Sequence, residues 1–181
     1  WIVTPSYNHL EWLSHCLLSV RDQAQGGVQA HHHVQDARST DGTVEHLARW
    51  RDETSDSACY SFSYASEPDG GMYDAINRGW LLAPSDVDVI AHLNCDEQYL
   101  PDALRRIGEV FLSRPQADIV LADMIVVDRD GKYICHRRSL RPYAWLSRII
   151  CAGATVATFQ RATVVQHKKV LFDTSWRNIG D

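Results

Sequence analysis

Two observations predict an α/β fold with a doubly wound, mostly parallel sheet and helices on both of its faces. Strand-like and helix-like stretches alternate through four units between residues 2 and 114, and repeated strand–helix units bring their strands together in parallel. Each of these strands also ends in polar residues. Ligands of such sheets bind beyond the carboxyl ends of the strands, so the sequence predicts a site that collects from several loops.

The first two units follow from hydrophobic spacing. A short strand stopped by Pro5 precedes apolar residues that recur at helical spacing from Leu10 to Ala24. Residues 31–36 then have the composition of a second strand ending in Asp36. Polar residues at 39–41 are typical N-caps, and they predict that the second helix starts directly after them.

The next two units repeat this order. Alternating side chains predict a third strand over residues 59–66, and Met72 to Leu82 has the spacing of a helix. Residues 87–94 form an apolar run that predicts the fourth strand. Pro101 stands at the first turn of the helix that follows, where its missing N–H costs least.

The pattern changes after Gln116. Residues 117–138 predict two strands of a hairpin around the turn at Asp128 to Gly131. A helix over 142–150, a strand over 154–161 and a loop to Asp181 are expected to follow. The sequence predicts one domain over residues 1–181, truncated at its C-terminus.

Composition excludes several classes of protein. Apolar residues at 45% and charged residues at 23% are ordinary for a globular domain, and the apolar runs are too short for a membrane span of about 20 residues. A net charge of −5 argues against a nucleic-acid partner, which would require a basic surface. The cysteines form no CxxC pair, which favours a reducing compartment, the cytoplasm; they are Cys16, Cys59, Cys95, Cys135 and Cys151.

Two acids follow the fourth strand directly. Asp96 and Glu97 would face the crevice at the end of that strand, where a carboxylate can hold a hard divalent cation that also contacts a diphosphate. Such a cation makes a diphosphate a better leaving group, because it neutralises the charge that develops as the bond breaks. The alternative, that these acids only cap the next helix or lie in solvent, is equally compatible with their spacing.

The stretch "SEPDGGMYDAINRG" places glycines and acids before a helix. Gly70 and Gly71 allow positive φ and a close approach of the backbone to a ligand, and a helix N-terminus attracts anions. Glu67 and Asp69 would repel a bare phosphate, so they suit sugar hydroxyls or a metal instead. A surface turn with a helix cap is the alternative.

Three consecutive histidines, His31 to His33, suggest zinc at first sight. Successive side chains of a strand point to opposite faces, so the three imidazoles cannot converge on one ion. We therefore expect ordinary strand histidines.

Four motifs in chain order resemble those of the family 2 glycosyltransferases, which are inverting nucleotide-sugar enzymes of the GT-A fold. These motifs are "VTPSYN" with "CLLSVRDQ", then "QDARSTDGTVEHL", "SEPDGGMYDAINRGWLLA" and "HLNCDEQYLPDAL". The resemblance covers Ile2 to about Arg114 and, more weakly, the rest. It implies a nucleotide-sugar-binding half at 1–116, an acceptor-side half at 117–181, and a role in polysaccharide biosynthesis.

The resemblance also implies roles for individual residues. The first-strand loop would hold the nucleotide base, an acid after the second strand would read the base edge, typically uracil, and the DxD motif would supply the ligand of Mn²⁺ or Mg²⁺. A terminal acid would be the catalytic base. The residues that match the base-binding loop are Thr4, Pro5 and Tyr7, and the acid that reads the base edge is Asp36. Asn94, Cys95 and Asp96 match the DxD motif, with Asp96 as the metal ligand, and Asp181 matches the catalytic base. A further loop with its helix would bind the sugar and the diphosphate; its matching residues are Glu67, Asp69, Gly70, Asp74, Asn77 and Arg78.

The chain departs from the family pattern at two places. Asn94 replaces the first acid of the DxD motif, which weakens a metal or ribose contact there. Ala37 and Arg38 stand where relatives often carry glycines, so the loop is expected to be stiffer, with Arg38 placed to reach a phosphate.

The predicted reaction moves a sugar from a nucleotide donor, UDP-linked, to a glycan or lipid-linked acceptor, and the latter is compatible with peripheral association at the inner face of a membrane. Two other functions stay open. A non-catalytic nucleotide- or sugar-binding relative would fit Asn94 and the early chain end. A nucleotidyltransferase would require a basic, glycine-rich loop after the first strand, where this chain has "TPSYNHLEW".

Overall fold

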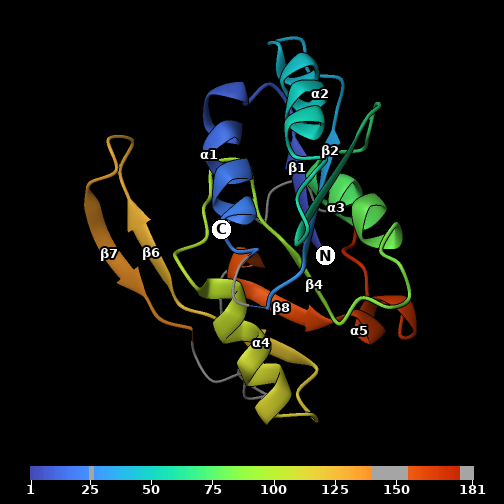
Figure 1. The fold of residues 1–181 in the computed structure, drawn as a ribbon, viewed down its shortest axis with the longest axis vertical. Helices are drawn as coiled ribbons and strands as arrows, with labels where there is room; N and C mark the ends of the chain where they lie inside the picture. The colour runs from blue at the N-terminus through green and yellow to red at the C-terminus, as the bar shows by residue number, and fades with distance from the viewer. Residues whose placement is uncertain (25–26, 140–154, 176–181) are drawn as a thin grey trace.

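The computed structural model describes residues 1–24, 27–139 and 155–175, and its main feature is a six-stranded sheet (Figure 1). The strand order is β3-β2-β1-β4-β8-β5. Neighbours among β1 to β4 run parallel, and β8 is antiparallel to both of its neighbours. The bounds are β1 Ile2–Ser6, β2 Ala30–Asp36, β3 Tyr60–Ser66, β4 Val89–His92, β5 Ile119–Leu121 and β8 Thr158–Arg161.

Helices cover both faces of this sheet, as the sequence predicts. The helices are α1 (Leu10–Arg21), α2 (Thr43–Glu53), α3 (Met72–Leu81), α4 (Ala103–Ser113) and α5 (Ala162–Gln166). Successive residues of β1 enter opposite cores, because side chains alternate along a strand. Ile2 packs with residues of α1 and α2, whereas Val3 packs with residues of α3 and α5. A third cluster joins α4 to β4 and β8 through Ile107, Phe111, Ala91 and Phe159.

The second half differs from the sequence-based expectation. The hairpin is confirmed, with β6 (Met124–Val127) antiparallel to β7 (Tyr133–Arg137), and Figure 1 shows it standing apart from the main sheet. However, the stretch before it is divided, because β5 pairs with β8 in the main sheet. The expected strand at 154–161 is shortened to β8 by a 3-10 turn (η1, Thr155–Ala157), and α5 replaces part of the expected final loop. The expected helix at 142–150 lies outside the described residues.

Two global expectations can be compared with the described part of the chain. No helix there has the length and apolar character needed to cross a membrane. The cysteines of the described ranges, Cys16, Cys59, Cys95 and Cys135, are free thiols.

Helix α3 approaches the sheet closely at Gly79. A Cβ at this position would lie 2.5 Å from Val3 Cγ1 and 3.1 Å from the His33 ring. Replacing Gly79 by Ala is expected to lower the free energy of unfolding by about 1–3 kcal/mol, because overpacking pushes the helix off the strand. Urea denaturation measures this change.

Gly108 is the matched control, because it also lies inside a helix and a Cβ there would meet no atom within 4 Å. Gly108→Ala is expected to raise the free energy of unfolding by about 0.5–1 kcal/mol through helix propensity alone. Equal effects of the two substitutions would show that the contact with β1 is not tight.

Candidate functional site

The order of the sheet places a topological switch point between β1 and β4. The chain passes from β1 to β2 and β3 on one side, and then returns to β4 on the other side of β1. Crevices at the carboxyl ends of strands flanking such a point are where doubly wound sheets bind ligands. Four loops are predicted to form the site, and all leave the sheet at this edge: residues 4–8 at the end of β1, 36–40 after β2, 66–71 after β3 and 94–97 after β4.

Asp36 organises the β2 and β3 side of this edge. Register places Asp36 beside Ser6 of β1 and Ser66 of β3. The Asp36 carboxylate is fully buried and accepts hydrogen bonds from the hydroxyls of Ser39 (2.5 Å) and Ser66 (2.6 Å), and from the Ser39 N–H (3.0 Å). It thus ties two loops together. Its predicted contact with a nucleotide base stays a prediction.

The serines at this edge are site residues that sequence reasoning did not single out. Ser39 and Ser66 bind Asp36, and the buried hydroxyl of Ser6 has no hydrogen-bond partner among the described residues. A small hydroxyl residue directly at the end of a strand is the signal that could have identified Ser6 and Ser66. Only the pairing register shows that both stand next to Asp36.

The glycine loop before α3 uses its own acids to hold its backbone. Gly71 has φ 113°, the left-handed region that favours glycine, as predicted. The Gly70 N–H donates to Asp74 Oδ2 (2.8 Å) and the Gly71 N–H donates to Asp69 Oδ1 (2.9 Å). Carboxylates therefore already occupy two N–H groups that a diphosphate would otherwise use. The acids of this loop are therefore bonded to its backbone and to Arg78.

Arg78 compensates the acids of this loop. Its guanidinium lies 2.7 Å from Asp74 and 3.1 Å from Glu67, and it also donates to the Pro68 carbonyl (3.0 Å). The Gly70 N–H and then Arg78 hold the pKa of Asp74 below its usual value. Burial is the main cause that raises the pKa of Asp69, and the charges of Asp74 and Asp36 add to it. The loop that carries Asp69 follows β3, which pairs with β2, and Ser66 at the end of β3 binds Asp36.

The loop after β4 leaves one acid free. Asp96 is exposed and makes no hydrogen bond or ion pair within the described ranges, whereas Glu97 accepts the Asn94 N–H (3.0 Å). The buried Asn94 Oδ1 has no partner among described residues, and an amide oxygen left in this state normally indicates a missing partner.

These features fit a cation that is shared with a ligand. Magnesium-like ions often take one or two carboxylates together with substrate phosphates. The described part of the chain contains no cluster of three or more His, Cys, Asp or Glu side chains that could hold a metal alone. Asp96 is therefore suited to a cation that is completed by a diphosphate.

Two of the residues predicted to contact the donor have side chains that are hydrogen-bonded within the protein, and their donor contacts stay predictions. The Thr4 side chain is fully buried, with its hydroxyl 2.8 Å from His32 Nε2, so it faces the core. The Asn77 side chain is buried and pairs with the backbone of Phe172. Pro5 is buried as well, and of the three residues predicted to hold the base only Tyr7 is exposed, at 60%. Asp181 lies outside the described residues.

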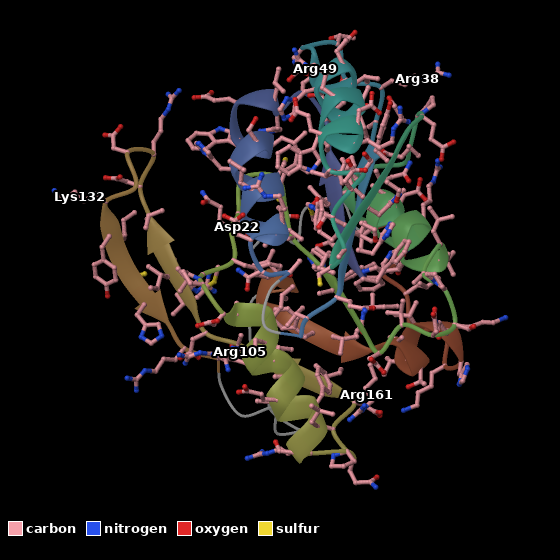
Figure 2. All side chains as sticks on the ribbon, viewed as in Figure 1. Asp22, Arg38, Arg49, Arg105, Lys132 and Arg161 are labelled. Atoms are coloured by element: carbon pink, nitrogen blue, oxygen red, sulfur yellow. The ribbon has the colours of Figure 1, made fainter. Side chains whose placement is uncertain are left out.

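Arg38 has the strained backbone that its replacement of a glycine predicts. Its φ is 58°, in the left-handed region that an L-residue other than glycine adopts at a cost. The side chain is exposed in the loop between β2 and α2, and Figure 2 shows it at the upper right periphery of the molecule. The loop after β2 therefore presents one guanidinium to solvent, and its predicted contact with a phosphate stays a prediction.

The three histidines divide between the two faces of β2, as predicted. His31 stacks on Trp1 with 4.0 Å between ring centroids, and His31 and His33 share the Ser63 hydroxyl. His32 points to the opposite face, towards Thr4. Their hydrogen bonds account for them without a metal.

Comparisons with known proteins place the chain in context. The sequence profile described as "Glycosyl transferase family 2" matches residues 1–176. Two proteins called uncharacterized glycosyltransferases, from Mycobacterium tuberculosis strains CDC 1551 / Oshkosh and ATCC 25618 / H37Rv, are each 36% identical over 110 residues. The match covers 60% of this chain and 38% of each relative, so the chain spans well under half of the length of those proteins.

Solved structures show the same fold. TarS (residues 1–349) from S. aureus in complex with UDP gives a TM-score of 0.73 at 18% identity, covering 98% of this chain and 51% of TarS. A mannosyltransferase from Pyrobaculum calidifontis in complex with GDP-Man and Mn²⁺ gives 0.65 at 15% identity, covering 96% and 47%. The predicted GT-A architecture, a mostly parallel sheet flanked by helices, is confirmed.

Proposed function

Because this chain belongs to glycosyl transferase family 2, we propose that it transfers a sugar from a UDP-linked donor to a glycan or lipid-linked acceptor, with inversion at the anomeric carbon. The observation that carries this proposal is the meeting of three loops at the β1/β4 switch point. They bring the hydroxyl-bound Asp36, the Arg78-paired acids and the free Asp96 to one edge of the sheet.

Each loop has a role in this proposal. Tyr7 and the Asp36 region would hold the base, Glu67, Asp69 and Arg78 the sugar and diphosphate, and Asp96 a divalent cation, Mn²⁺ or Mg²⁺. When bound, such a cation neutralises the charge that develops on the diphosphate. The unpaired Asn94 oxygen next to Asp96 supports a further contact there, with the ribose or the cation.

The chemistry would be a single displacement. The acceptor hydroxyl oxygen attacks the anomeric carbon, its proton passes to the carboxylate of Asp181, and the bond between that carbon and the diphosphate oxygen breaks on the opposite face. Arg78 stays paired with Asp74 and Glu67, so it can orient the donor without adding a free charge.

The setting of this activity is also part of the proposal. We place it in the cytoplasm, with polysaccharide biosynthesis as its context and peripheral association with a membrane where the acceptor is lipid-linked. Division of the domain into a donor half, 1–116, and an acceptor half, 117–181, agrees with the location of the three loops in the first half.

A donor assay tests the proposal. We expect UDP to bind in calorimetry and UDP-GlcNAc, the ligand of one TarS complex, or another nucleotide sugar from a panel, to be hydrolysed slowly in the presence of Mn²⁺. Asp181→Asn should leave UDP affinity unchanged and lower hydrolysis by about 100-fold or more, since the general base is lost.

Asp56→Asn, in an exposed loop, is the control and should change neither quantity. If no nucleotide binds, the transferase proposal fails. If Asp181→Asn is as active as the parent protein, the base lies elsewhere.

A non-catalytic relative is the second candidate, favoured by Asn94 in place of the first acid of the motif. Such a protein would bind UDP and turn over no nucleotide sugar in the same panel. A nucleotidyltransferase would instead release pyrophosphate from a nucleoside triphosphate, which a pyrophosphate assay detects.

A further inference from the structure

Two adjoining faces of helix α3 contact different parts of the protein. Asp74 and Arg78 lie one helical turn apart and face the glycine loop. Tyr73, Asn77 and Trp80 lie at helical spacing on the adjoining face, and all three contact Phe172. The same rigid helix therefore meets the proposed donor loop and the segment 170–173, which leads along the chain to Asp181.

Asn77 joins α3 to this segment through a pair of reciprocal hydrogen bonds. Its Nδ2 donates to the Phe172 carbonyl (2.8 Å), and its Oδ1 accepts the Phe172 N–H (2.9 Å). An amide can satisfy both backbone groups of one residue in this way, as a neighbouring strand would. The Asn77 side chain is only 8% exposed, so these bonds are shielded from water.

Apolar packing alone does not hold the segment. A cavity of about 170 Å³ lies beneath it; among described residues the cavity is lined by Trp80, His92, Thr158, Gln160, Val170, Leu171 and Phe172. The Phe172 ring meets His92 edge-on at 5.6 Å, and both ring nitrogens of the buried His92 lack partners among described residues. Ring stacking of Phe172 on Tyr73 and Trp80 and a backbone bond from the Val170 N–H to the Val164 carbonyl (3.2 Å) also hold the segment. The Asn77 bonds add a buried side-chain attachment at Phe172 itself.

We propose that Asn77 is a positioning residue that holds the segment 170–173 at a set distance from the donor loop, and so controls the transfer step without binding the donor. The inference rests on the proposed transferase function for its kinetic consequence. A misplacement of about 1 Å can cost about 100-fold in rate, so loosening this attachment would lower turnover while the donor loop keeps its own hydrogen bonds.

Asn77→Ala is the test variant. Amide exchange at Phe172 is expected to accelerate by about tenfold or more as the segment opens locally. The UDP dissociation constant should stay within about twofold, and the rate of nucleotide-sugar hydrolysis should fall by about tenfold or more. Asn77→Asp keeps the acceptor for the Phe172 N–H but sets a carboxylate against the Phe172 carbonyl; it should show the same split between affinity and rate.

Gln23→Ala is the matched control. Gln23 is also buried, at 6% exposure, and it also bridges distant backbone groups, donating to the Leu100 carbonyl and accepting the Leu104 N–H, each at 3.1 Å. This variant loses an equivalent pair of hydrogen bonds to backbone groups, at a place away from segment 170–173. It should accelerate exchange at Leu104, leave exchange at Phe172 unchanged, and lower hydrolysis less than Asn77→Ala does.

Three results would overturn the inference. A loss of UDP affinity in Asn77→Ala as large as the loss of rate would make Asn77 a donor contact. Unchanged exchange at Phe172, or an unchanged rate with faster exchange, would show that the Asn77 bonds do not position the reacting groups. If the parent protein binds no nucleotide, the transferase proposal fails, and the exchange measurement still reports whether these bonds exist.

Discussion

Replacing Asp96 by Asn is expected to abolish the effect of manganese on UDP affinity and to lower the rate of nucleotide-sugar turnover by about 100- to 1,000-fold. Asp96 is the one acid of the 94–97 loop that is exposed and makes no bond within the described ranges. An amide is a weak ligand for a hard cation, so the charge developing on the diphosphate would lose its compensation. Calorimetry with UDP and Mn²⁺, and with UDP and a chelator, measures the first effect, and a hydrolysis assay measures the second.

Asp102→Asn is the control for this substitution. Asp102 is exposed, lies six residues further along the chain and pairs with Arg105 at 3.3 Å. Its φ of 63° is readily adopted by asparagine, so the fold should tolerate the change. Equal UDP affinity with metal and with chelator in the parent protein would argue against Asp96 as a ligand.

Stability is expected to fall steeply between pH 6.5 and 4.5, because His32 is buried in its neutral form. Burial lowers the pKa of His32 to about 3, from the ordinary value of 6.5. The unfolded chain therefore binds a proton below pH 6.5 that the folded protein does not. The free energy of unfolding loses up to about 1.4 kcal/mol per pH unit from this one group, and burial of His31 and His92, which lowers the pKa of each to about 4, acts in the same direction.

Urea denaturation at several pH values measures this slope. His32→Gln removes the titrating ring and keeps a donor for the Thr4 hydroxyl. This substitution should lower the free energy of unfolding at pH 7. It should also make that free energy depend less steeply on pH, by the amount that corresponds to about one proton fewer taken up on unfolding. His167→Gln is the control and should leave the slope unchanged, because this side chain is exposed to water in the folded protein as in the unfolded chain. A slope in His32→Gln equal to that of the parent would mean that His32 is already protonated in the fold.

Much of the donor half was predictable because its signals are local. Helical spacing and a strand ending in acids lie within about ten residues of one another, and β1 to β4 and α1 to α4 follow these signals closely. The cap predictions were wrong in position, because the N-cap of α2 is Gly42 and Pro101 precedes Asp102, the N-cap of α4. The second half was less predictable: β5 is recognisable as a strand of the main sheet only through its partner β8, which lies about forty residues later in the chain. Helix α5, with five residues, is too short for a periodic pattern.

The site shows the same division. The sequence predicted which loops would carry chemistry, and the structure shows Asp96 in the loop after β4 and Asp74 and Arg78 in α3 beside the glycine loop; their roles stay predictions. The sequence could not indicate which polar side chains are already hydrogen-bonded to other residues of the chain. Thr4 and Asn77 carry suitable groups, but their partners are His32 and Phe172, 28 and 95 residues away.

The sequence by itself determined the α/β class, the order of the first four strand–helix units and the identity of the loops at the carboxyl edge, because neighbouring residues encode periodicity and caps. Only the tertiary structure decided that β8 enters the sheet antiparallel, that Asp36 is locked by two serines, and that Asn77 faces segment 170–173. Those outcomes depend on contacts between groups far apart in the chain, whose pairing is selected by packing and hydrogen-bond satisfaction as the chain folds.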